Sequence, residues 1–198
     1  VYSISAQNEP KKLLAIFAHP DDEQSVAPLL VKLVEEGVEV TLVIATDGRL
    51  GVNEYNDNKA GDGLANIRRK EMMCAADILG VKLIHLDYHD QLRAAEGFDG
   101  HVPHAQNLIL ELKNIIDKVK PDAIITWGPD GVTTHMDHRL VGASVTQVFV
   151  SQKWKNSMKL YFFGVPSDML DSQKVKTLRG QERSFLNVQI PFTWDQYD

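Results

Sequence analysis

Apolar residues in this chain follow two alternating spacings, short continuous runs and longer stretches with helical periodicity. The continuous runs, several of them rich in β-branched residues, predict strands at 13–18, 38–45, 81–88, 122–127 and 158–165. Apolar positions three or four residues apart predict helices at 26–34, 64–79, 101–119 and 135–149. Gly37 and Gly80 are placed to end the first two of these helices.

Strands that alternate with helices are typical of βαβ units, which form a mainly parallel sheet. We therefore expect an α/β fold, a Rossmann-like three-layer sandwich with helices on both faces of the sheet. The 198 residues and 43% hydrophobic content predict a single domain over 1–198. Residues 1–11 are expected to form an N-terminal extension, and the tail at 168–198 has no clear place.

The charge, hydrophobicity and cysteine content of the chain exclude some classes of partner and structure. The formal net charge is −6, and the only short basic run is Arg68-Arg69-Lys70, so a nucleic-acid partner is not expected. No apolar stretch approaches the roughly 18 residues of a membrane span. Cys74 is the one cysteine, which excludes an internal disulfide, and its helical neighbours place it in the core. Small residues near the start leave two compartments open, the cytoplasm or export after removal of a signal.

Acidic residues follow the first predicted strand, where open α/β sheets place their sites. The segment reads His19-Pro20-Asp21-Asp22-Glu23, and its carboxylates would attract a cation and repel a phosphate. A dinucleotide site is therefore disfavoured, as the missing glycine pattern also indicates. With Pro20 at the first helical position, His19 and Asp22 would share one face while Asp21 points elsewhere. The alternative is that these acids only complement a helix dipole.

A second cluster follows the fourth predicted strand. His135 and His138 are three residues apart at the predicted start of a helix, and the two clusters would meet if their strands form the middle of the sheet. Two imidazoles and one carboxylate with an open position are typical of a catalytic zinc site, although iron or cobalt could occupy it. Trp127, which ends the fourth strand, either packs in the core or forms a platform for a sugar.

The combination of AHPDDE at 18–23 and HMDH at 135–138 resembles the LmbE/PIG-L de-N-acetylases. These are zinc enzymes that remove acetyl groups from N-acetylglucosamine-containing substrates. The resemblance runs from about Leu13 to about Phe149. It implies a small amino-sugar substrate and a zinc ion as cofactor.

Site residues are implied by the same resemblance, position by position. His19, Asp22 and His138 would bind the metal. Asp21 would be the general base, and His135 would stabilise the oxyanion with a charge that Asp137 favours. The residues at positions that contact the sugar in relatives are Arg68 and Asp90.

Two departures and two alternatives accompany this resemblance. Met136 stands where the family usually has proline, which is expected to loosen the turn without removing a ligand. The loop at 49–63 is particular to this chain and is expected to shape substrate choice. The alternatives are another hydrolase on the same metal, such as an amidase of a thiol-sugar conjugate, and a non-catalytic sugar-binding module. A homo-oligomer is possible under each of them.

Overall fold

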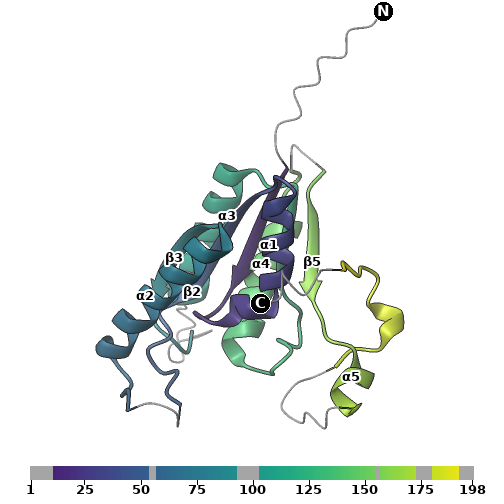
Figure 1. Cartoon of the computed structure of the whole chain (residues 1–198). Helices are drawn as coiled ribbons and strands as arrows, with labels where there is room; N and C mark the ends of the chain where they lie inside the picture. The colour runs from purple at the N-terminus through teal and green to yellow at the C-terminus, as the bar shows by residue number, and fades with distance from the viewer. Residues whose placement is uncertain (1–10, 54–56, 93–102, 155–156, 173–179, 192–198) are drawn as a thin grey trace, which may run out of the picture.

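Five parallel strands form one sheet at the centre of the molecule (Figure 1). The computed structural model describes residues 11–53, 57–92, 103–154, 157–172 and 180–191. The strands are β1 (Lys12–Phe17), β2 (Glu39–Thr46), β3 (Lys82–Tyr88), β4 (Ala123–Trp127) and β5 (Lys159–Phe163). Their order across the sheet is β3-β2-β1-β4-β5. The predicted parallel α/β fold is confirmed.

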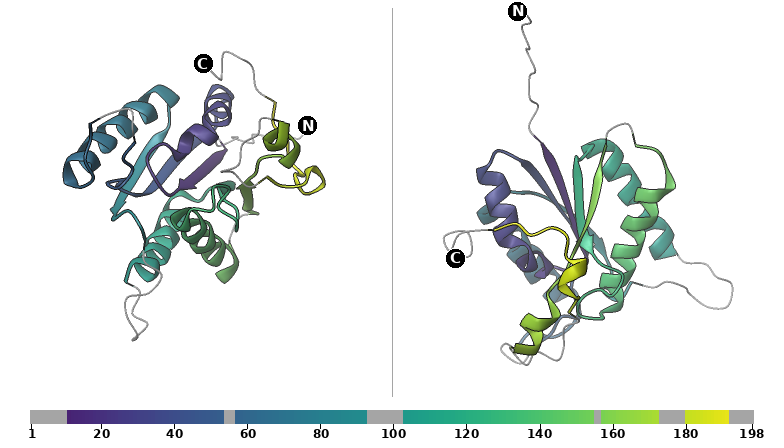
Figure 2. Two further views of the ribbon diagram at one scale, coloured as in Figure 1. Left: turned by 90° about the horizontal axis from the view of Figure 1, so that it is seen from below. Right: turned by 90° about the vertical axis from the view of Figure 1, so that its right-hand side faces the viewer.

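Helices cover both faces of this sheet, as Figure 2 shows. Helices α1 (Ala27–Glu35) and α2 (Asp62–Leu79) pack on one face, and α3 (Pro103–Val119) and α4 (Met136–Ser151) pack on the other. Strand β1 is buried on both sides because its alternate residues enter the two cores. The first core includes Ala15, Phe17, Leu30, Leu42 and Met72. The second includes Leu14, Ile16, Val43, Leu112 and Val145.

Two local expectations are corrected, and the predicted start of a third element at 101 is not described. The chain does not enter a helix at Pro20, since Asp22–Ser25 form a 3-10 turn and α1 begins only at Ala27. Helix α3 begins at Pro103, and His101 lies outside the described residues. Cys74 is exposed on α2 rather than buried in the core.

The position of the site follows from the strand order. From β1 the chain adds β2 and β3 on one side and β4 and β5 on the other, so the switch point lies between β1 and β4. Ligands of open α/β sheets bind in the crevice beyond the carboxyl ends of strands at such a point. His19 follows β1 there, and residues 128–138 follow β4.

The described part of the tail lies beyond β5. It comprises α5 (Ser167–Ser172) and a short 3-10 turn at Arg183–Phe185, joined to the end of β5 by a bridge between Pro166 and Gln181. Among the described helices, we find none with the length and hydrophobicity that crossing a membrane requires. The predicted N-terminal extension lies almost entirely outside the described residues, and the single domain stays a prediction.

Candidate metal centre

Asp22 is held so that one of its carboxylate oxygens faces His138. Its Oδ2 accepts hydrogen bonds from the backbone N–H groups of Ala18 and His19, both at 2.9 Å, and from Trp127 Nε1 at 3.2 Å. Its Oδ1 lies 3.1 Å from His138 Nε2. His19 and Asp22 therefore converge as predicted, but a tight backbone turn brings them together rather than a shared helical face. The side chain of Asp22 is only 7% exposed.

His138 presents Nε2 to the same point. Its Nδ1 lies 3.0 Å from the carbonyl oxygen of Gly131, which can only accept, so Nδ1–H donates there and Nε2 is directed at Asp22 Oδ1. The Trp127 ring stacks on the imidazole, with centroids 4.4 Å apart and an interplanar angle of 6°. Trp127 is 2% exposed, which decides between its two predicted roles in favour of packing.

His19 is oriented by two carboxylates on its far side. Its Nε2 lies 3.0 Å from Asp90 Oδ1 and 3.1 Å from Asp137 Oδ2, so Nε2–H donates and Nδ1 faces His138 Nε2 at 3.3 Å. Burial alone would lower the pKa of His19, but hydrogen bonds to Asp137, Asp22 and Asp90 raise it to about 11. This pocket thus stabilises positive charge at the position where a cation would bind.

Distances between the potential ligand atoms test whether these residues fit zinc. Tetrahedral ligands about 2.1 Å from a zinc ion lie about 3.4 Å from one another. The observed separations are 3.3 Å between His19 Nδ1 and His138 Nε2, and 3.1 Å between His138 Nε2 and Asp22 Oδ1. These two separations match tetrahedral zinc, and the printed contact between His19 and Asp22, from Nδ1 to Oδ2, is 3.7 Å.

Two other groups of potential ligand atoms share residues with the proposed ligands, the first His19 and His138 and the second His19 alone. In each of them the atoms lie within 4.8 Å of one another, and the groups are His19-His135-His138 and His19-Asp90-Asp137. The second group would need His19 Nε2, which already donates to the two carboxylates. Asp90 and Asp137 are therefore better placed to orient His19 than to bind the metal beside it.

His135 caps the N-terminus of α4 at the edge of the site. Its Nδ1 accepts the backbone N–H of Asp137 at 3.2 Å, which leaves Nε2 as a donor, and its ring lies against His19 with centroids 4.7 Å apart. Partial burial and the charge of His19 lower the pKa of His135, and the opposing effect of Asp137 is smaller. Asp137 thus favours the charged form of His135, as expected, but burial and the charge of His19 outweigh it. Met136 is 65% exposed, and the cap forms without the usual proline.

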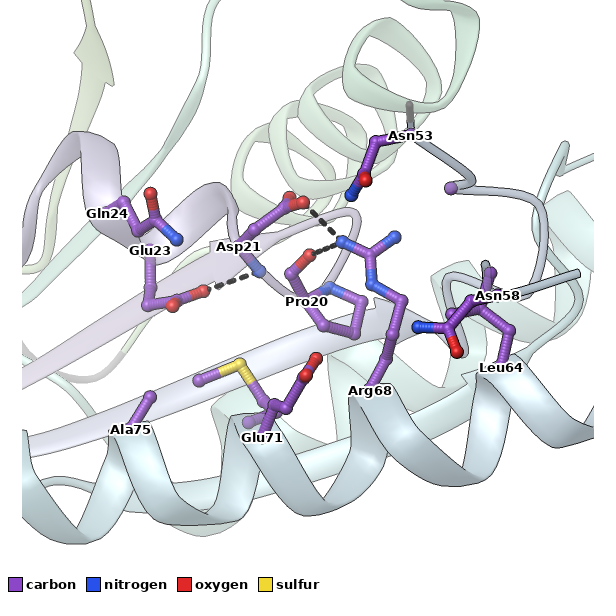
Figure 3. Close-up of a pocket in the computed structure, with 12 residues that line it drawn as sticks. Pro20, Asp21, Glu23, Gln24, Asn53, Asn58, Leu64, Arg68, Glu71 and Ala75 are labelled. Atoms are coloured by element: carbon purple, nitrogen blue, oxygen red, sulfur yellow. Dashed lines mark hydrogen bonds and ion pairs between the residues drawn. The ribbon is translucent and has the colours of Figure 1, made fainter. Parts of the chain in front are cut away.

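Asp21 pairs with Arg68 (Figure 3). Arg68 rises from α2, and its guanidinium also donates to the carbonyl oxygens of Pro20 and Gly48. Partial burial raises the pKa of Asp21, although the charge of Arg68 acts in the opposite direction. Arg68 is 9% exposed. The contacts described above join it to Asp21 and to backbone carbonyl oxygens. Its predicted contact with a sugar stays a prediction.

A hollow of about 310 Å³ lies beside this ion pair. Its walls come from the segment after β1, from α2 and from described residues of the loop between β2 and α2. They include Glu23, Asn53, Asn58, Leu64 and Glu71 (Figure 3). Glu23 is buried here and accepts the backbone N–H of Asp21. The sequence contained Glu23 within its acidic cluster but gave no sign of this contact.

Asp90 is buried beside the Nε2 side of the His19 ring. Its Oδ2 accepts the backbone N–H of Leu50 at 2.9 Å while Oδ1 accepts from His19. Burial would raise the pKa of Asp90, but these hydrogen bonds lower it to about 2. The residue is 8% exposed, and its expected contact with substrate also stays a prediction.

Known proteins with a similar sequence or fold give a consistent picture. The chain is 30% identical over 141 residues to a 1D-myo-inositol 2-acetamido-2-deoxy-alpha-D-glucopyranoside deacetylase of Corynebacterium glutamicum, covering 64% of this chain and 49% of that protein. It is 34% identical over 142 residues to a mycothiol S-conjugate amidase of Streptomyces coelicolor, covering 64% and 47%. The chain thus spans about half the length of these relatives.

A solved structure agrees with the sequence relatives. The N,N'-diacetylchitobiose deacetylase of Pyrococcus horikoshii matches with a TM-score of 0.61 and 30% identity, over 87% of this chain and 59% of that one. The family model described as PIG-L: GlcNAc-PI de-N-acetylase matches residues 14–149, which include the whole centre described above. The chain therefore belongs to the PIG-L family.

Proposed function

We propose that this chain forms the catalytic core of a metal-dependent hydrolase that removes the acetyl group from a small N-acetylglucosamine-containing substrate. The observation that carries this proposal is the orientation of three side chains toward one point. In each ring one nitrogen donates to a fixed acceptor, which directs His19 Nδ1 and His138 Nε2 toward each other, and Asp22 Oδ1 faces His138 Nε2. The relatives named above support the substrate class.

We propose zinc as the metal, held by His19, Asp22 and His138. Two imidazoles and one carboxylate that leave a position open suit catalytic zinc, and iron or cobalt are the competing metals. A bound zinc ion would supply a Lewis acid for the amide carbonyl and would lower the pKa of water toward about 7.

Two other residues, Asp21 and His135, would transfer the protons and stabilise the developing negative charge. Asp21, which is not needed as a ligand, would take a proton from water as general base. His135 would donate Nε2–H to the oxyanion, for which the neutral ring suffices because Nδ1 already accepts from the backbone. A neutral imidazole is a poor acid, so Asp21 would return its proton to the leaving amine.

An amidase that acts on a thiol-sugar conjugate is the second candidate, because the relative from Streptomyces coelicolor is named as such an enzyme. The same metal centre would serve both reactions. The two candidates differ in the acyl group that is released, which an acetate assay can distinguish.

The test is a metal analysis combined with an acetate-release screen. Purified protein is loaded with zinc and offered N,N'-diacetylchitobiose and the inositol and malate glycosides of N-acetylglucosamine, with a thiol-sugar amide in parallel. We expect one zinc ion per chain and acetate from at least one acetylated sugar, and the His138→Ala variant should lose both. Cleavage of the thiol-sugar amide alone would favour the amidase. One zinc ion with no cleavage of any compound would favour a binding module.

A further inference from the structure

Glu23 is a buried carboxylate that the proposed mechanism does not use. Its side chain is 5% exposed and lies beside two other acids, Asp21 and Asp22. Burial of a carboxylate is costly unless it accepts hydrogen bonds. Glu23 Oε2 accepts the backbone N–H of Asp21 at 2.9 Å, as the dashed line in Figure 3 shows.

The backbone of Asp21 explains why this contact matters. Asp21 has φ 98° and ψ −19°, in the left-handed region that residues with a Cβ rarely adopt. Such a conformation persists where the surrounding contacts determine it. Three contacts hold Asp21. Its N–H donates to Glu23, and its carbonyl oxygen accepts a hydrogen bond from Gln24 N at 3.2 Å. The carboxylate of Asp21 pairs with Arg68.

Because Asp21 has a left-handed backbone conformation, the carboxylates of Asp21 and Asp22 have different partners. Asp22 turns inward to His138, while Asp21 turns to Arg68 beside the hollow. If the N–H of Asp21 were released, its backbone could relax toward negative φ and its carboxylate would move. The oxygen that takes the proton would then no longer be fixed relative to the metal centre.

We propose that Glu23 is a positioning residue that holds Asp21 in its left-handed conformation through the hydrogen bond from Glu23 Oε2 to Asp21 N–H. This inference rests on the proposed role of Asp21 as general base. The proposed role of Glu23 requires a side chain of this length that ends in an acceptor oxygen. It does not require the negative charge of the carboxylate.

Two substitutions separate the effect of the length of the Glu23 side chain from the effect of its charge. Glu23→Gln keeps an oxygen acceptor at the same distance but removes the charge. Glu23→Asp keeps the charge but shortens the side chain by one methylene, about 1.5 Å, which breaks the hydrogen bond. Glu71→Gln and Glu71→Asp are matched controls, because Glu71 lines the same hollow from α2 and no contact with Asp21 is found for it among the described residues.

The readouts are kcat and KM for acetate release from N,N'-diacetylchitobiose, together with zinc content. We expect Glu23→Asp to lower kcat about 10- to 100-fold, the cost typical of a misplaced catalytic group, with KM and zinc content unchanged. Glu23→Gln and both Glu71 variants should stay within about threefold of the parent, by the same reasoning. The proposal is overturned if Glu23→Asp retains its kcat, if Glu23→Gln loses as much, or if kcat falls only in proportion to zinc.

A second measurement does not depend on activity. Hydrogen exchange of the Asp21 amide in the zinc-loaded protein should be fast in Glu23→Asp and slow in the parent and in Glu23→Gln. Equal exchange in all three proteins would overturn the proposal even if no substrate is cleaved. A parent protein that releases no acetate but shows the expected exchange pattern would instead count against the proposed function.

Discussion

Replacing Trp127 by phenylalanine would remove one hydrogen-bond donor from Asp22 while keeping an aromatic ring at the end of β4. Trp127 Nε1 is one of three donors to Asp22 Oδ2, and its ring stacks on His138. The substitution therefore changes the support of two proposed zinc ligands without touching either of them. A weaker hold on Asp22 Oδ2 should leave Oδ1 less firmly directed at the metal.

The size of the effect follows from the geometry. A hydrogen bond to a charged group contributes about 1.5–3 kcal/mol, and the bond from Trp127, at 3.2 Å, is the longest of the three. We therefore take the lower value, about 1.5 kcal/mol, which corresponds to about a tenfold change in an equilibrium constant. Loss of groups that orient metal ligands typically weakens metal binding about 10- to 100-fold, which agrees with this figure.

A competition titration of zinc against a chelating indicator measures this effect directly. Trp154→Phe is the matched control, because Trp154 donates Nε1–H to the carbonyl oxygen of Phe149 at the end of α4, not to the metal centre. The zinc Kd should rise about tenfold in Trp127→Phe and stay unchanged in Trp154→Phe. An unchanged Kd in Trp127→Phe, or an equal rise in both variants, would refute the reasoning.

Three other outcomes follow from the structure. Asp21→Asn should lower turnover by about 10²- to 10⁴-fold with zinc still bound, and parallel acetate and metal assays would show whether the two separate. Gly142→Ala should lower the free energy of unfolding in urea by about 1–3 kcal/mol, because its Cβ would lie 2.4 Å from the carbonyl oxygen of Trp127; a more stable variant would contradict this. Since the pKa of His19 is raised to about 11 without metal, zinc must displace a proton from it. Calorimetry at pH 7 in buffers of different ionisation enthalpy should detect release of about one proton, and the apparent affinity should rise with pH; no release would count against a ligand role for His19.

The place of the site could be predicted from the sequence because it depends on local patterns. Short apolar runs located β1 and β4, and the polar clusters that follow them had to meet if these strands were neighbours. The convergence of His19 and His138 was therefore expected, and it is observed. The exact path of the chain after β1 was not, because the left-handed conformation of Asp21 depends on Glu23 and Arg68, contacts that periodicity does not encode.

Contacts between distant segments account for the other differences. Asp90 and Asp137 both face His19 Nε2, although they are far from it and from each other in the sequence. Their approach is set by how the loops after β1, β3 and β4 meet at one edge of the sheet. The sequence alone therefore could not show that Asp137 orients His19, or that Arg68 is engaged by Asp21 and backbone carbonyls.

The central claim is that His19, Asp22 and His138 hold one divalent metal ion, and anomalous diffraction at the zinc edge tests it most directly. In crystals of the protein loaded with one equivalent of zinc, we predict a single strong peak about 2.1 Å from His19 Nδ1, His138 Nε2 and Asp22 Oδ1. A peak between His19 Nε2, Asp90 and Asp137, or no peak at this edge of the sheet, would contradict the account.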